Sequence, residues 1–406
     1  MTDTLATKPG GYRALLALAV PRRLALASIP ADFADWLDYA AVVALLVFAW
    51  GEGPFVLALF GFALTLPYVL IGPLLAVYID RTPLGRVLVL SNLGRGLTTL
   101  ALVFASSTPL VLLLVFLRSS IDSAFTPARQ AAIQASTPPT LLASANGLHQ
   151  AINQTSKIAG PALGGLLLAF IPAQSVFGLN AVLSLVAALS LIKLGLPLRE
   201  AREPSDIRTE LSAGAAEFRR NRMLLLALVF SAVAYFAFFL YDALIALLAA
   251  DFGFGPTAFG FGIAASGGGG LIGALVAGRL ASHPIACMSW SAMLSGAVTV
   301  AIALAAMAHI AVPIWLYFAA LAVMGGSTAF MLVPYRTIVQ AETPPDRIAR
   351  VFATGEALIT TVMLSAPFIG SLIASAYGTG AAFLCGGALV LLLGMVTAIT
   401  MLRRLP

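Results

Sequence analysis

Apolar positions run in long stretches separated by short polar ones along the whole chain. Most stretches reach or approach the ~20 residues that an α-helix needs to cross the hydrocarbon core of a bilayer. Twelve such spans are predicted, six in each half, at 24–50, 54–79, 87–105, 109–126, 145–171, 175–196, 223–250, 257–280, 285–309, 313–333, 351–377 and 381–402. The pattern therefore predicts an all-α polytopic membrane protein, whose longer spans tilt or protrude into water.

A short polar pattern occurs twice, each time just after a predicted span and with spacings that agree within one residue. The two copies are Pro127, Arg129, Gln134 and Thr137-Pro138-Pro139, and Pro334, Arg336, Gln340 and Thr343-Pro344-Pro345. Duplication of a six-helix unit is the simplest cause, and many secondary transporters are built from such repeats. The predicted domains are bundles at 1–198 and 223–406, joined by a hydrophilic cytoplasmic linker at 199–222.

Composition supports a lipid-exposed surface and charge sets the orientation. The 406 residues are 60% hydrophobic and only 10% charged, whereas soluble domains carry about 25% charged residues. Twenty of the 23 Lys and Arg residues lie in the N-terminal segment, in the loops that follow even-numbered spans, at the ends of spans, or in the tail. Basic loops stay in the cytoplasm, so both termini are predicted to be cytoplasmic, in a cell inner membrane. The basic pI of 9.6 then reflects orientation and indicates no nucleic-acid partner.

The sequence does not contain the motifs that are typical of several other functional classes of protein. The chain has no phosphate-binding loop for ATP hydrolysis, and its polar, basic first residues are not expected to form a removable signal peptide. Its three histidines are scattered without Cys or acidic residues at ligand spacing, so neither a metal site nor a cofactor is predicted. Cys287 and Cys385 fall at opposite ends of their spans and are not expected to pair. No catalytic constellation can be assembled, so an enzyme is not expected.

Charged residues within the spans give the most information about mechanism. Inserting one at the centre of a membrane helix costs at least ~2.5–3.5 kcal/mol of free energy, so each needs a reason to be there. They are Asp32, Asp35, Asp38, Arg95, Arg118, Asp122, Lys157, Asp242 and Glu356. The three acids of the first span share one helix face, and Arg118 and Asp122 are spaced to pair directly. The spans contain six acids and only three bases. This excess of carboxyls in a low dielectric disfavours the ionised form of some of them. The acids either line a wet cavity for protons or substrate, with Asp35 the first choice as proton carrier, or form closed ion-pair networks.

Two motifs carry a resemblance to a known family. Asp80-Arg81-Thr82-Pro83-Leu84-Gly85-Arg86, after the second span, resembles a loop signature of the major facilitator superfamily, with Ala76 and Pro83 in place of two of its glycines. The fifth span is similar to the antiporter signature of drug–proton exchangers in that superfamily. Its matching residues are Gly147, Ser156, Gly160, Pro161, Gly164 and Gly165. Residues 125–130 also resemble the branch that holds macrolide and siderophore exporters.

The resemblance implies roles for several of these residues. Asp80, Arg81, Arg86 and Arg129 would form a cytoplasmic gate, with Asp80 pairing a base such as Arg129; the alternative is that these charges only set topology. The small residues of the fifth span, with a kink at Pro161, would form a hinge or an outer seal against the partner half. Arg118 matches an arginine implicated in proton transfer, although Ile121 and Asp122 depart from the rest of that motif.

The sequence as a whole predicts a two-lobed, twelve-helix transporter that works by alternating access. It would export a small amphiphilic compound, either drug-like or a siderophore, in exchange for protons, and would bind it near the membrane midplane. A proton-coupled importer or a lipid flippase of the same fold is the alternative, followed by a membrane sensor that binds a solute without moving it. The expected partners are this substrate, protons and the bilayer, and the protein is expected to be a monomer.

Overall fold

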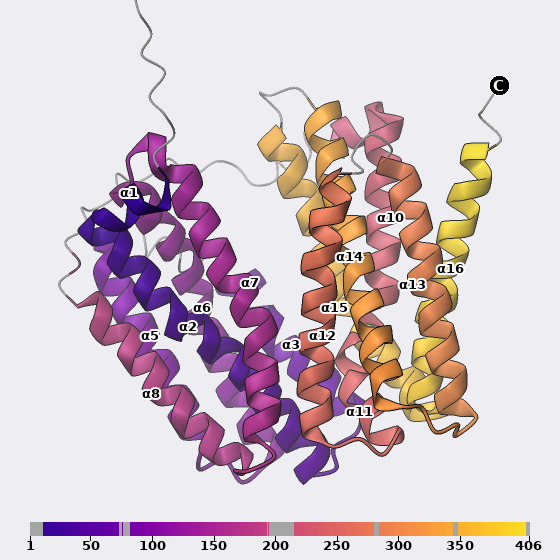
Figure 1. Ribbon diagram of the computed structural model, residues 1–406, viewed down its shortest axis with the longest axis horizontal. Coiled ribbons are helices and arrows are strands. Elements are labelled where there is room, and N and C mark those ends of the chain that lie inside the picture. Colours follow the sequence, from indigo (N-terminus) through magenta and orange to yellow (C-terminus); the bar gives the residue numbers. More distant parts are fainter. Residues whose placement is uncertain are drawn as a thin grey trace, which may run out of the picture. The chain divides into compact units, whose positions relative to one another are not determined.

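The computed structural model describes residues 11–72, 75, 82–192, 194, 215–279, 284–343 and 348–402. Within these ranges all regular secondary structure is helical, as the hydrophobic pattern predicts (Figure 1). Two compact units are present: one within residues 1–42 and 63–202, and the other within 43–62 and 203–406. Residues 43–62 thus group with the second unit, and the predicted domain limits at 198 and 223 stay predictions.

Each predicted span overlaps a helix in the part of it that the structure describes. In the first half these are α2 (Ala19–Ala44), α3 (Pro54–Leu70), α5 (Leu84–Leu102), α6 (Thr108–Ser136), α7 (Leu142–Leu167) and α8 (Ala173–Leu191). In the second half they are α10 (Arg222–Phe239) with α11 (Ile245–Asp251), α12 (Pro256–Arg279), α13 (Pro284–Met307), α14 (Ile314–Glu342), α15 (Ile348–Tyr377) and α16 (Thr379–Leu402). A short α1 (Tyr12–Ala17) precedes them.

Helix polarity differs between the two halves. Eight spans in the described part of the chain are long and apolar enough to cross a membrane: α6, α8, the run from α10 to α11, and α12 to α16. The four other predicted spans are α2, α3, α5 and α7, all in the first half. α3 has only 17 described residues, whereas α2, α5 and α7 carry charged or amide side chains. Polar groups at membrane depth are costly, so their concentration in the first half points to a functional site there.

The duplicated polar pattern lies at the same place in two matching helices. α6 and α14 are both 29 residues long, and each contains one internal proline, Pro127 or Pro334. Each ends at a threonine with extended backbone: Thr137 at φ −115° and ψ 125°, and Thr343 at φ −113° and ψ 130°. The predicted spans ended before this pattern, but Ala, Arg and Gln favour helix. The helices therefore continue through it, beyond their apolar stretches.

Close packing of glycines holds the helices together in the second unit. A Cβ atom on Gly269 of α12 would lie 1.9 Å from the Ala322 carbonyl oxygen of α14, and one on Gly325 of α14 would lie 1.9 Å from the Ser266 carbonyl oxygen. The two backbones therefore touch directly, as small residues permit in membrane helices. In the first unit the apolar core includes Val87 and Leu88 of α5, Phe125 of α6 and Leu191 of α8.

Candidate functional site

Three aspartates of α2 face α5 and α6 and meet arginines from both. Asp32 Oδ1 lies 2.5 Å from Arg129 Nη1 of α6. Asp35 is paired with Arg95 of α5 and, at 2.6 Å, with Nη2 of Arg118 of α6. Asp38 lies 3.0 Å from Arg118 Nε and accepts a hydrogen bond of 2.9 Å from the Thr99 hydroxyl. The i, i+3, i+6 spacing in α2 therefore turns all three carboxylates toward the same two helices.

Asp122 of α6 completes what we term the charge network: Asp32, Asp35, Asp38, Arg95, Arg118, Asp122 and Arg129. Its Oδ1 lies 3.4 Å from Arg95 Nη1, and its Oδ2 accepts a hydrogen bond of 2.7 Å from the Tyr68 hydroxyl of α3. Arg118, one turn earlier on the same helix, reaches across to Asp35 and Asp38 of α2. Its ion pairs thus join two helices, unlike the within-helix pair that the sequence spacing allows.

Phe125 of α6 lies between two of the guanidiniums. The Arg95 Cζ is 4.9 Å from the centre of the Phe125 ring, and the Arg129 Cζ is 5.1 Å from it. Phe125 is itself buried. An aromatic face attracts a cation, by about 2 kcal/mol where water is excluded, so this ring links the Asp35 and Asp32 parts of the charge network.

Burial gives the charge network its chemical character. Arg95 is fully buried, and the side chains of Asp32 and Asp38 are 2% and 5% exposed, whereas that of Asp35 is 28% exposed. Removing an ion from water costs several kcal/mol, which pairing must offset. Four carboxylates share three guanidiniums, so one negative charge is left uncompensated within the network. A proton or a cationic ligand group can neutralise it, and Asp35 is the most accessible position.

The structure brings together most of the acids and bases predicted for the cavity. Asp32, Asp35, Asp38, Arg118 and Asp122 all belong to the charge network. Arg129, predicted for the gate, belongs to it as well, and Arg95 lies at its centre. Sequence reasoning missed Tyr68, Thr99 and Phe125, because an uncharged side chain in an apolar span gives no signal of which face it occupies.

Two predicted cavity acids belong to the second unit, whereas the charge network belongs to the first. Asp242 begins a short 3₁₀ turn, Asp242–Leu244, between α10 and α11, and is half-buried. Glu356 of α15 is half-exposed, with its Oε1 4.0 Å from Arg336 Nη2 of α14. Their participation in transport stays a prediction.

The predicted gate residues have different positions. Asp80 and Arg81 lie outside the described residues. Arg86 is exposed in the first turn of α5, and Arg129 is paired with Asp32. An Asp80–Arg129 latch therefore stays a prediction, and it would have to draw Arg129 away from Asp32.

The small residues of the antiporter-like segment pack on α2 of the same unit. A Cβ atom on Gly160 would lie 2.5 Å from Trp36 Cβ, and one on Gly164 would lie 3.1 Å from Ala40 Cβ. Gly147 lies near the Tyr12 hydroxyl, while Ser156, Pro161 and Gly165 are buried. α7 continues through Pro161, and Lys157 Nζ lies 5.2 Å from the Trp36 ring centre. α7 is thus held against the helix that carries the three aspartates.

Comparison with known proteins gives the family. The sequence model of the Major Facilitator Superfamily matches residues 24–354. The chain belongs to this superfamily. It is therefore a membrane transporter with the twelve-helix, two-repeat fold, and not an enzyme. The resemblance drawn from the sequence motifs is confirmed.

Individual relatives are distant but cover most of the chain. The MFS-type transporter YfiS of Bacillus subtilis is 28% identical over 373 residues, covering 90% of this chain and 89% of YfiS. Macrolide efflux protein A of Streptococcus pyogenes is 24% identical over 343 residues, covering 82% and 84%. Among solved structures, the nucleoside transporter NupG aligns with a TM-score of 0.73 at 13% identity, covering 95% of this chain and 99% of NupG. A bacterial homologue of the iron transporter ferroportin aligns with a TM-score of 0.72 at 18% identity, covering 94% and 98%. At these identities the structural matches show the fold alone.

Proposed function

We propose that this transporter exports a small amphiphilic compound in exchange for protons by alternating access. The observation that carries the proposal is the charge network, in which four aspartates share three arginines and only Asp35 is appreciably exposed. In a low dielectric an uncompensated carboxylate is unfavourable. Either a proton or the cationic group of a substrate can neutralise this carboxylate, so proton and substrate can replace each other at Asp35.

The contacts of Asp35 support a way in which proton binding would cause a structural change. Its Oδ1 is shared by Arg95 of α5 and Arg118 of α6. A proton on Asp35 removes the charge that draws both guanidiniums toward α2. Of the described ion pairs, the two arginines then keep only those with Asp38 and Asp122. Arg95 also keeps its hydrogen bond to the Ala31 carbonyl oxygen of α2, so the contact of α2 with α5 and α6 weakens without being lost. Such a two-state contact is what alternating access requires.

Two further observations support the direction and the substrate class. Macrolide efflux protein A, a similar protein by sequence, has efflux in its name, and the segment at Gly147 to Gly165 is similar to the antiporter signature. The proposed setting is a cell inner membrane with both termini in the cytoplasm, and the proposed working form is a monomer. A siderophore is the other substrate class that the sequence resemblance suggests.

Inside-out vesicles test this proposal. With an acidic interior, they should accumulate a radiolabelled macrolide or a fluorescent amphiphilic cation. Asp35→Asn should abolish this gradient-driven accumulation. Substrate binding should survive only in part, because the amide resembles the protonated acid in shape but attracts no cationic group. Asp251→Asn, at an exposed helix end, is the matched control and should transport normally.

The outcomes separate the candidate functions. Accumulation only under the reversed pH gradient would make the protein an importer. Substrate binding without any gradient-driven movement would favour a sensor. Normal transport by Asp35→Asn would move coupling away from Asp35, leaving Asp122 and Glu356 as the next carboxyls to test.

A further inference from the structure

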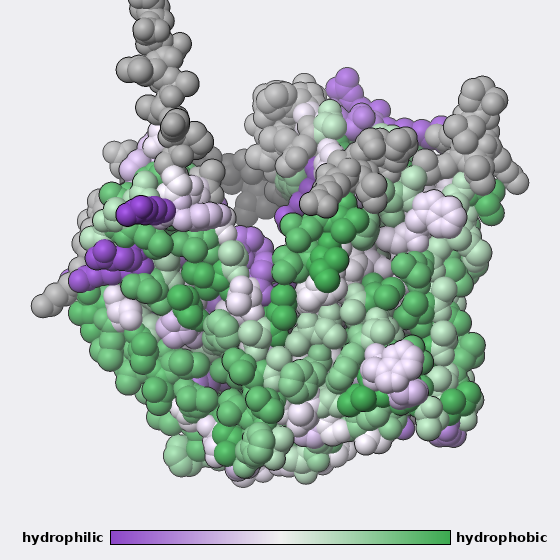
Figure 2. Space-filling model, in the orientation of Figure 1, coloured by the Kyte–Doolittle hydropathy of each residue, from purple (hydrophilic) through white to green (hydrophobic). Residues whose placement is uncertain are grey.

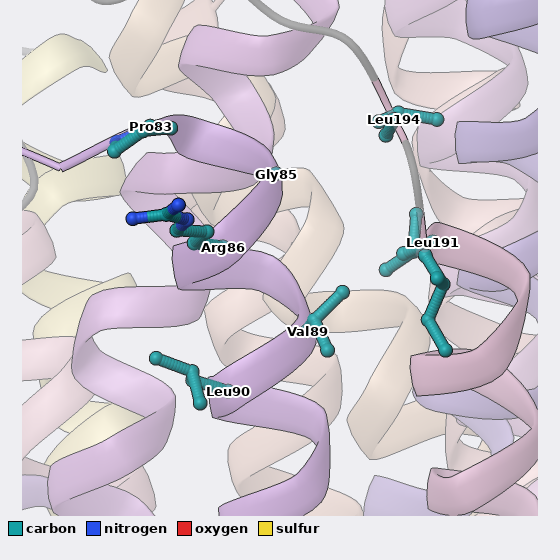
Figure 3. Close-up of a pocket in the computed structure, with 8 residues that line it drawn as sticks. Pro83, Gly85, Arg86, Val89, Leu90, Leu191 and Leu194 are labelled. Atoms are coloured by element: carbon teal, nitrogen blue, oxygen red, sulfur yellow. The ribbon is translucent and has the colours of Figure 1, made fainter.

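An open groove runs between the first turns of α5 and the last turn of α8. It has a volume of about 550 Å³ and is lined by Pro83, Gly85, Arg86, Val89, Leu90, Leu191, Ile192 and Leu194 (Figure 3). In Figure 3, Val89 of α5 extends toward Leu191 of α8, while Arg86 extends from the turn above, next to Pro83. Apart from Arg86, every side chain of this groove is apolar.

A second groove adjoins the first at Ile192. It has a volume of about 330 Å³ and is lined by Arg23 and Leu26 of α2 and by Leu189, Ser190 and Ile192. Each groove therefore combines one arginine with several apolar side chains. The same chemistry recurs on both sides of the end of α8.

Gly85 gives the first groove its floor. A Cβ atom at this position would lie 2.6 Å from the Leu194 carbonyl oxygen, so only glycine lets the chain beyond α8 lie on the first turn of α5. The groove is thus built by the packing of two helix ends, and Leu84 and Gly85 beneath it are buried.

The apolar walls of both grooves are exposed rather than covered. Leu90, Leu26 and Leu189 are each more than half exposed, and the arginine side chains beside them are exposed as well. Neither Arg86 nor Arg23 forms an ion pair with any residue that the structure describes. Figure 2 shows the flank that carries α8 as largely hydrophobic, with hydrophilic residues gathered toward the end of the unit where α1 lies.

The position of the grooves matches the chemistry of a lipid. They lie where membrane helices begin and end, which is the level of the headgroups whichever way the protein faces. A soluble anion would gain nothing from the exposed leucines. A zwitterionic lipid carries its own ammonium beside the phosphate, and this cation competes with the guanidinium. A molecule with an anionic phosphate next to acyl chains uses both.

We propose that the groove between α5 and α8 binds an anionic glycerophospholipid, and that the adjoining groove at Arg23 binds a second lipid of the same class. The phosphate of the first lipid pairs with Arg86, and its acyl chain lies along Val89, Leu90 and Leu191. The bound lipid bridges α8 and α5, the helix that carries Arg95 of the charge network. This proposal does not depend on the substrate or on the direction of transport.

Native mass spectrometry of the full-length protein in a neutral detergent tests this site. Phosphatidylglycerol and phosphatidylcholine with identical chains are titrated separately. The wild type should retain two phosphatidylglycerol molecules in preference to phosphatidylcholine. Arg86→Gln should lose one of them, with about a fivefold weaker affinity, since a basic residue near an anionic headgroup contributes about 1 kcal/mol. Arg86→Gln with Arg23→Gln should lose the preference for phosphatidylglycerol altogether.

Three controls make the result decisive. Arg219→Gln, an exposed arginine outside both grooves, should retain both lipids. Leu90→Ser should also weaken lipid retention, since the acyl chain loses part of its wall. Glycerol phosphate, which has the anion without the chains, should not displace the lipid at equal concentration. Equal retention of phosphatidylcholine, displacement by glycerol phosphate, or wild-type lipid retention by Arg86→Gln would each overturn the proposal.

Discussion

Arg129 of α6 lies 2.5 Å from the carboxylate of Asp32 in α2, and both side chains are largely buried. Arg336 occupies the corresponding place in the second copy of the duplicated pattern, in the equally long α14. It lies 4.0 Å from Glu356, and both of these side chains are about half exposed. The same sequence pattern thus supplies a structural ion pair in the first unit and a solvent-exposed one in the second.

This difference predicts unequal effects of removing the two arginines. Arg129→Gln leaves the Asp32 carboxylate buried without its base, which costs about 3–5 kcal/mol. Arg336→Gln removes a screened pair worth at most about 1 kcal/mol. Thermal unfolding in detergent should therefore show a large fall in melting temperature for Arg129→Gln and almost none for Arg336→Gln.

The double variant identifies the cause of the loss. Asp32→Asn combined with Arg129→Gln removes both charges and should recover much of the stability that Arg129→Gln loses. A double variant as unstable as Arg129→Gln alone would show that Arg129 stabilises the protein through Phe125 or through its packing, and not by compensating Asp32.

The helices and the acids could be predicted from the sequence because both follow from local rules. About twenty apolar residues in a row can hardly adopt anything but a helix in a bilayer. Charged residues within such a run are easily recognised in the sequence. The three-residue spacing of Asp32, Asp35 and Asp38 was enough to place them on one face. The length of α6 and α14 was not predictable in this way, because hydropathy ends where the helix leaves the membrane.

The partners of each acid could not be predicted, because they depend on how separate helices pack. Arg118 is four residues from Asp122, yet its ion pairs are with α2, since the packing of α6 on α2 decides where its guanidinium lies. The family resemblance implies a gate role for Arg129, and only the structure places its guanidinium beside Asp32. Tyr68 is one aromatic residue among several in its span, and only the structure places its hydroxyl on Asp122.

The double contact of Phe125 predicts that its ring matters beyond its volume. Phe125→Leu keeps an apolar side chain but removes the attraction to Arg95 and Arg129, each worth about 0.5–2 kcal/mol. Gradient-driven transport should fall several-fold at normal expression. Phe177→Leu is the control, because Phe177 is buried in α8 of the same unit and has no cation beside its ring among the described contacts. Equal losses in both variants would reduce Phe125 to a packing residue.

The contact between Gly160 and Trp36 predicts that even one methyl group is too large in α7. Gly160→Ala would place Cβ 2.5 Å from Trp36 Cβ, which forces α7 away from α2 and should lower the melting temperature and the folded yield. Gly178→Ala in α8 meets no atom within 4 Å, and alanine favours helix by up to ~1 kcal/mol. That variant should be at least as stable as the wild type. If Gly160→Ala is equally stable, α7 has room to move against α2 and is not held there by close packing.

The uneven distribution of basic residues predicts the orientation of the protein in the membrane. Single cysteines can test this orientation once Cys287 and Cys385 have been replaced by alanine. Gly53→Cys and Gly255→Cys fall in loops without bases, where an added Cβ meets nothing within 4 Å. Arg220→Cys falls on an exposed position just before α10, on the basic side.

An impermeant maleimide added to intact spheroplasts should label Gly53→Cys and Gly255→Cys. It should label Arg220→Cys only after the membrane is permeabilised, because basic loops stay in the cytoplasm. Labelling of Arg220→Cys in intact spheroplasts would reverse the orientation, and a Gly53→Cys that reacts from the opposite side to Gly255→Cys would overturn the twelve-span topology.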